Sequence, residues 1–245
     1  MGLRGRLTKE QFAFTMPVDA PLYQRPPFYY KDVQLALFEY ETDAEAAASI
    51  LPAPLELTDT PTAALALVEY PWTTFGPYNE AILFVMCTHH GRPMQYITQI
   101  FLTTEPPMAA GREIWGIPKK LAHIGFVKEN DHLMGYVERP KGLRLCSGVM
   151  RPERPINLTS FSAIPPVCLR VIPSPEEGAL PSLAELIEID VVQRPKDIWE
   201  GPGSCHFTGA SDLDPWHKMP VKKMRRCTFA VYDMDLKYGK IIERL

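Results

Sequence analysis

The chain has 245 residues, with 26 lysines and arginines against 29 aspartates and glutamates, so it lacks the basic surplus typical of nucleic-acid-binding proteins. No apolar run reaches the roughly 18 residues that a membrane-spanning helix needs, and no signal-peptide pattern is present. The 25 prolines are about twice the average share. Because they are spread along the chain and separated by apolar runs, they exclude a helical bundle and favour a strand-rich globular protein.

The first half of the chain predicts an extended arm followed by strands and one helix. Residues 1–32 are rich in proline and aromatic residues, which is typical of an extended N-terminal arm. A helix is expected where Thr42 to Glu45 has the spacing of a capping box, and Pro52 ends it. Apolar or alternating runs predict strands before and after this helix, at 33–40, 62–70, 80–88 and 94–102.

The second half of the chain also predicts mainly strands. Ile187, Ile189 and Val191 alternate with acidic residues, which favours a strand over a helix at 183–192. Residues 195–220 are rich in glycine, proline and tryptophan and are predicted to be irregular. Further strands are expected at 121–127, 132–137, 143–150, 167–172 and 228–234. With no linker or repeat, the pattern predicts a single α+β, strand-dominated domain over 1–245, built as a barrel or a wrapped sheet.

The cysteines and histidines point to no metal or disulfide framework. The five cysteines are odd in number and form no CxxC pair, which predicts free thiols in a reducing compartment, hence the cytoplasm. His89 and His90 are adjacent, so on a strand they would face opposite sides and could not bind one ion. No dinucleotide-binding, phosphate-binding or hydrolase motif appears, and no metal site is expected.

The most informative stretch is 111–122, in which Pro118 precedes the pair Lys119 and Lys120 inside an otherwise apolar segment. This stretch closely resembles the active-site segment of the acetoacetate decarboxylase family. Further similar stretches recur in order over roughly residues 20–245, at 40–43, 51–56, 78–80, 96–113, 169–173, 199–202 and 220–222. The resemblance implies a closed, cone-like β-barrel with a few short helices, a homo-oligomer, and a lyase that acts on a small keto acid without a separate cofactor.

The resemblance also implies roles for individual residues. Lys119 matches the lysine that forms a Schiff base with the substrate, and Glu80 matches the catalytic glutamate. The amine must be neutral to react, but an ordinary lysine, with a pKa of about 10.4, is neutral in only roughly one molecule per 2,500 at pH 7. Acetoacetate decarboxylase is itself an established case of a lysine activated by desolvation or by a neighbouring cation. We expect desolvation to dominate here and Lys120 to tune the amine secondarily, because adjacent residues of a strand point to opposite faces.

The sequence departs from the decarboxylase pattern at two charged positions. An arginine on the first strand of the family corresponds to Val33, and a second glutamate corresponds to Leu65 or Ala66. In this respect the chain looks closer to a divergent branch whose members condense pyruvate with an aldehyde and dehydrate the aldol. A tyrosine that serves as a proposed acid/base group in that branch is matched best by Tyr232.

Other residues are expected to bind the substrate. Gln99, in an apolar strand, and Arg112 are candidates for the substrate carboxylate, and Arg112 could instead pair with Glu113. The apolar wall is expected to include Ile114, Trp115, Ile117 and Phe101. Three hypotheses follow: pyruvate aldol condensation and dehydration, slightly preferred; decarboxylation of acetoacetate or another β-keto acid; and a non-catalytic barrel that binds a small carbonyl compound.

Overall fold

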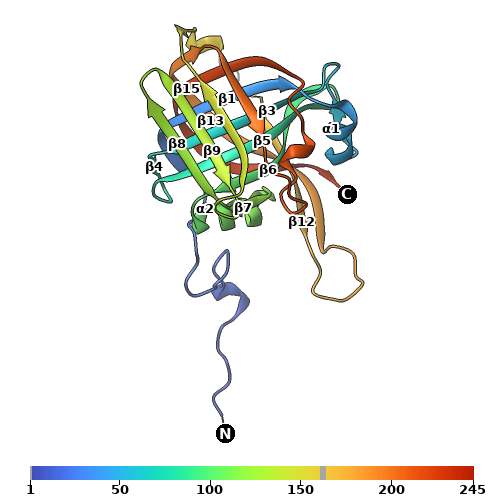
Figure 1. The fold of residues 1–245 in the computed structure, drawn as a ribbon. Helices are drawn as coiled ribbons and strands as arrows, with labels where there is room; N and C mark the ends of the chain where they lie inside the picture. The colour runs from blue at the N-terminus through green and yellow to red at the C-terminus, as the bar shows by residue number, and fades with distance from the viewer. Residues whose placement is uncertain (1, 161–163) are drawn as a thin grey trace.

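The computed structural model describes residues 2–160 and 164–245, and strands dominate it (Figure 1). The helical elements are short: η1 Lys9–Gln11, α1 Ala44–Ile50, α2 Glu105–Ala110, the π-helical turn η2 Gly111–Trp115, η3 Leu158–Ser160 and η4 Trp216–Lys218. The strands are β1 Phe28–Glu41, β2 Glu56–Leu57, β3 Thr62–Tyr70, β4 Trp72–Thr73, β5 Tyr78–His89, β6 Arg92–Leu102, β7 Lys119–Leu121, β8 His123–Glu129, β9 His132–Glu138, β10 Arg144–Met150, β11 Arg154–Pro155, β12 Pro166–Ile172, β13 Leu183–Glu200, β14 Gly203–Phe207 and β15 Lys223–Arg244.

The main sheet closes on itself. Its strands follow the order β2-β5-β3-β1-β15-β13-β12-β6-β7, and an additional β5–β6 pairing joins the two ends of this path into a ring. Most neighbours are antiparallel, while β12 and β7 run parallel to β6. The strand-dominated α+β class predicted from the sequence is confirmed, in the form of a closed ring of strands.

Two large apolar clusters lie on the two faces of this ring. The first fills its interior and draws side chains from β1, β3, β5, β6, β12, β13 and β15. The second lies between the outer face of β1, β3 and β5 and a separate four-stranded sheet of order β14-β10-β9-β8. Figure 1 shows β8 and β9 lying across β3 and β5, in agreement with contacts between these strands. The site described below faces the interior cluster.

The burial of β3 explains its composition. Ala63 to Val68 are all buried, because one face of β3 looks into the ring and the other is covered by the second sheet. A strand covered on both faces reads as a continuous apolar run rather than as an alternating one. Its predicted bounds, 62–70, match the structure.

Three elements differ from the prediction. β13 continues through Pro195 to Glu200, because a register shift between Pro195 and Asp197 accommodates the missing N–H of proline. The segment 195–220, predicted to be irregular, therefore begins as a strand and also contains β14. β15 extends to Arg244, because pairing with β13 holds its polar end. The stretch 105–115, for which the sequence predicted no helix, forms α2 and η2, since prolines fit the first turn of a helix, where no N–H partner is needed.

The N-terminal segment is anchored where it reaches the ring. β1 begins at Phe28, earlier than the predicted residue 33. Before it, the hydroxyl groups of Thr15 and Tyr23 both donate to the Glu113 carboxylate, the Tyr23 bond being 2.5 Å long. Glu113 therefore accepts hydrogen bonds from the N-terminal segment, and the ion pairs of the described residues do not include an Arg112–Glu113 pair.

Among the described helices, none has the length and apolar character needed to cross a membrane.

Candidate active site

The turn before Lys119 is built to aim its side chain inward. Gly116 has φ +71°, and a Cβ there would meet the backbone of Arg170 at 2.2 Å, so only glycine fits. Pro118 then leads into β7, where Lys119 lies beside Ile100 of β6 in parallel register. The Arg112 guanidinium donates to the main-chain oxygen of Lys119 at 3.1 Å, so Arg112 supports the turn.

The Lys119 side chain lies against a glycine. A Cβ placed on Gly111 would be 2.7 and 2.8 Å from Cδ and Cε of Lys119, closer than van der Waals contact allows. The absence of a side chain at Gly111 therefore leaves the space that the lysine stem occupies. This contact ties the π-helical turn to the position of the amine.

Lys119 and Glu80 form a buried pair. The Lys119 Nζ lies 2.7 Å from Glu80 Oε1, and each side chain is only 5% exposed. The other carboxylate oxygen, Oε2, accepts a hydrogen bond of 3.0 Å from the hydroxyl of Tyr70. A buried charge is costly unless it is paired, and each member of this pair supplies the other's partner.

Four tyrosines surround this carboxylate. Burial raises the pKa of Tyr30, Tyr70, Tyr78 and Tyr232, and the nearby Glu80 carboxylate raises each further. The hydroxyl of Tyr78 donates to that of Tyr30 at 3.4 Å, and the ring centroids of Tyr70 and Tyr78 are 4.6 Å apart. The phenols therefore stay protonated near neutral pH and are available as hydrogen-bond donors.

The sequence singled out only Tyr232 of these four. Tyr78 alternates with Glu80 along β5, and the two therefore face the same side, which is the signal that could have found Tyr78. Tyr70 lies opposite Tyr78 in the β3–β5 register, and Tyr30 lies on β1, the next strand, so strand pairing brings these rings together.

The expected apolar wall is partly present. Trp115 and Ile117, 1% and 5% exposed, belong to the interior cluster, and Ile114 packs against it. Phe101 does not, because it faces the second cluster and stacks on Trp216 with centroids 4.9 Å apart. Adjacent strand residues alternate between faces, so Phe101 takes the face opposite to Ile100.

Lys120 likewise lies on the opposite face from Lys119. It pairs with Phe101 in register, and its Nζ lies 2.8 Å from Asp214 Oδ1 and 2.5 Å from the main-chain oxygen of Leu213. Its positive charge is thus neutralised away from the interior. Of the two lysines, only Lys119 therefore faces the interior, where Glu80 is its partner.

The two residues expected to bind the substrate carboxylate do not point toward the Lys119–Glu80 pair. Gln99 lies opposite Leu83, a member of the second cluster, so the register turns its side chain away from the interior. Arg112 is engaged with the main chain of Lys119. Val33 and Ala66 stand at the two positions where the decarboxylase pattern has charged residues. Both are buried in the interior cluster, so apolar side chains line the interior at these positions.

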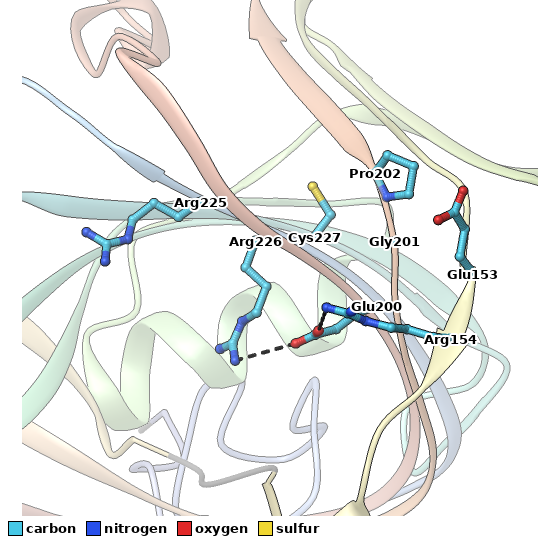
Figure 2. A pocket seen from close by; sticks show the side chains of 8 residues that line it. All are labelled: Glu153, Arg154, Glu200, Gly201, Pro202, Arg225, Arg226 and Cys227. Carbon is cyan, nitrogen blue, oxygen red and sulfur yellow. Dashed lines mark hydrogen bonds and ion pairs between the residues drawn. The ribbon is translucent and has the colours of Figure 1, made fainter.

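A surface pocket elsewhere in the molecule is lined by charged side chains (Figure 2). Figure 2 shows Arg154 and Arg226 both directed at Glu200, with N···O distances of 3.1 and 3.9 Å. Arg226 also pairs with Glu39 at 2.5 Å. These charges neutralise one another, whereas Lys119 and Glu80 form a buried pair beside the interior cluster, so we place the candidate active site at Lys119.

The described cysteines are free and buried, as the sequence predicted. The geometric argument about the adjacent histidines was wrong, however. His89 ends β5, but His90 has φ +50° and lies in the turn that follows, and their ring centroids are 4.2 Å apart. A left-handed residue breaks the alternation that would have separated the two rings.

Comparison with known proteins agrees with the sequence and the fold. Over residues 15–245 the chain matches the family described as acetoacetate decarboxylase. Acetoacetate decarboxylase 2 of Mesorhizobium japonicum is 31% identical, over 94% of this chain and 88% of its own.

Solved structures extend the likeness to the whole fold. Acetoacetate decarboxylase from Legionella pneumophila superposes with a TM-score of 0.87 at 26% identity, covering 100% of this chain and 99% of its own. The enduracididine biosynthesis enzyme MppR, solved in complex with pyruvate, has a TM-score of 0.80 at 18% identity, covering 96% of this chain and 98% of its own. At that identity the second likeness concerns the fold alone.

Proposed function

Because the chain belongs to the acetoacetate decarboxylase family, we propose that it is a lysine Schiff-base lyase that decarboxylates a β-keto acid. The observation that carries the proposal is the 2.7 Å contact between the buried Lys119 amine and Glu80. A buried lysine beside a proton acceptor is the arrangement that carbonyl condensation requires.

The first steps make and use the neutral amine. Glu80 accepts a proton from the Lys119 ammonium, and the free amine attacks the ketone carbon of the substrate. A proton taken up from solvent lets the carbinolamine hydroxyl leave as water, which gives an iminium. The bond between the α-carbon and the carboxylate then breaks, CO2 leaves, and the bonding electrons pass to the iminium nitrogen to form an enamine.

The last steps need a proton and a water. Protonated Glu80, held by the Tyr70 hydroxyl at 3.0 Å, returns its proton to the enamine carbon. Hydrolysis of the resulting iminium releases the ketone and restores Lys119. The tyrosines around Glu80 supply hydrogen-bond donors in a site from which burial excludes most water.

The apolar interior bears on the substrate. Val33 and Ala66 replace the two charges that the family pattern places near the lysine, so a substrate with a longer apolar acyl chain fits better than acetoacetate. We expect kcat/KM to rise from acetoacetate to 3-oxohexanoate.

Borohydride trapping tests the proposal. Wild-type protein incubated with acetoacetate or 3-oxohexanoate and then reduced should gain one adduct mass, which peptide mapping places on Lys119. Lys119→Arg should form no adduct, whereas Lys120→Arg, the matched control, should form it at the wild-type rate. Absence of an adduct on Lys119 with these acids and with pyruvate would overturn the proposal.

Pyruvate aldol condensation and dehydration is the second candidate, and the position of Tyr232 beside the Glu80 carboxylate favours it. In that reaction the pyruvate enamine attacks an aldehyde, and loss of water gives an unsaturated keto acid. CO2 release from a β-keto acid indicates the first reaction. An unsaturated keto acid formed from pyruvate and an aldehyde, without CO2 release, indicates the second.

A further inference from the structure

The turn between β5 and β6 brings two imidazole rings together. His90 and Gly91 are its two central residues, both with positive φ, at 50° and 76°, and His89 pairs with Arg92 across the hairpin. The rings of His89 and His90 have centroids 4.2 Å apart, inclined at 50°. The two imidazoles therefore lie side by side at the turn.

A carboxylate from a distant part of the chain faces the same point. Glu243, near the end of β15, places Oε2 3.6 Å from Nε2 of His89. One donor atom from each of His89, His90 and Glu243 lies within 4.8 Å of the others. The three groups thus converge although two of them are more than 150 residues from the third.

The His89 nitrogen in this cluster lacks a partner. The side chain is 9% exposed, and its Nε2 is buried and makes no hydrogen bond in the described structure. The 3.6 Å separation from Glu243 exceeds the hydrogen-bond range of about 2.7 to 3.2 Å. Two ligands of one tetrahedral zinc ion, each about 2.0 to 2.2 Å from the metal, are about 3.4 Å apart. The separation therefore resembles that of two ligands of one ion.

We propose that His89, His90 and Glu243 bind one divalent transition-metal ion, and that Zn2+ fits the donor set best. Two imidazole nitrogens and one carboxylate oxygen suit Zn2+, whereas Mg2+ and Ca2+ prefer oxygen ligands throughout. Three protein donors leave a fourth position for water. The Glu243 side chain is 36% exposed, so the ion has access from solvent.

Neighbouring charges leave Glu243 available for a metal. Arg92 forms two hydrogen bonds with the carboxylate of Glu188, and the bond from Nη1 to Oε1 is 3.0 Å long. Lys240 lies opposite Glu188 in the sheet register. In the ion pairs of the described residues, Glu243 pairs with His89 and with no arginine or lysine.

The bound ion would join the β5–β6 turn to β15. It would lie far from the chemistry, because His89 is nine residue steps along β5 from Glu80, or about 30 Å at the rise of an extended strand. The expected effect is therefore on stability, with the Schiff-base reaction unchanged.

Isothermal titration with Zn2+ after dialysis against EDTA tests the site. The wild type should bind one equivalent, with a Kd below 10 μM set as the criterion, and its Tm should rise with Zn2+ concentration. His90→Asn, which retains a residue tolerant of positive φ, and Glu243→Gln should each weaken binding at least tenfold. His132→Asn is the matched control, because His132 also lies beside a carboxylate, that of Asp131 at 2.7 Å, on an exposed turn.

The control variant should bind as the wild type does. A wild-type Kd above 100 μM would overturn the proposal, and so would equal affinities of the wild type, His90→Asn and Glu243→Gln. Borohydride trapping on Lys119 should be the same with and without Zn2+, so failure of the metal site and failure of the proposed reaction give separate readouts.

Discussion

Substitution of Gly111 by alanine tests how closely the Lys119 amine is positioned. The new Cβ would lie 2.7 Å from Cδ of Lys119, whereas ordinary contact begins at 3.4 Å, so the stem must move by about 0.7 Å. A misplacement of about 1 Å at a reacting group costs roughly 100-fold in rate. We therefore expect kcat/KM for a β-keto acid to fall by about 100-fold.

The effect on stability should be smaller, because two contributions oppose each other. Gly111 has φ −60° in a helical turn, where alanine is favoured by about 1 kcal/mol. Overpacking costs about 1 to 3 kcal/mol. The free energy of unfolding should thus fall by no more than about 2 kcal/mol, as measured by urea denaturation.

Gly148→Ala is the matched control, since its Cβ would meet the Phe38 ring at 2.7 Å in the second cluster, away from the interior. This variant should lose stability but keep the wild-type kcat/KM at a temperature where it stays folded. The reasoning would be refuted if Gly111→Ala trapped substrate on Lys119 at the wild-type rate, or if both alanine variants lost activity equally.

Three further outcomes are expected. Tyr70→Phe removes a hydrogen bond to a charged acceptor, so kcat should fall at least tenfold in steady-state assays, and an unchanged kcat would remove Tyr70 from the proton path. Lys120→Met should lower kcat/KM less than tenfold, since this ammonium lies on the face opposite to Lys119; a larger loss, reversed by Lys120→Arg, would show that its charge matters. Burial raises the pKa of Cys87 from 9.0 to about 11, so at pH 8 its thiolate is about 100-fold scarcer than usual. Iodoacetamide should accordingly label Cys87 slowly in native protein and rapidly in guanidinium, as read by mass spectrometry, and fast native labelling would contradict its burial.

Local patterns predicted most strands, and their failures have physical causes. The α1 helix forms where it was expected, but its cap is Asp43 rather than Thr42, and the Asp43 side chain accepts from the Ala46 N–H at 3.0 Å. Helix α2 was missed because Pro106 and Pro107 indicate a turn unless they occupy a first helical turn. The polar end of β15 carries no apolar pattern and is held by partner strands, which sequence periodicity does not report.

The site was predictable only in part. The resemblance pointed to Lys119 and Glu80, which the structure brings to 2.7 Å. The tyrosines around Glu80 depend on which strands are neighbours in the sheet, and His90 depends on one backbone angle, so neither followed from residue type. Phe101 was misplaced because apolar runs in doubly covered strands conceal which residues face inward.

The order in which the ring closes has a consequence for synthesis. β1 pairs with β15, and β15 supplies Tyr232 to the surroundings of Glu80. While the chain grows on the ribosome, β1, β3, β5 and β6 can pair early, but residues 223–244 must emerge before the ring is complete. The growing chain therefore exposes an unfinished interior until residues 223–244 have emerged, and the surroundings of Glu80 are complete only once β15 has paired with β1.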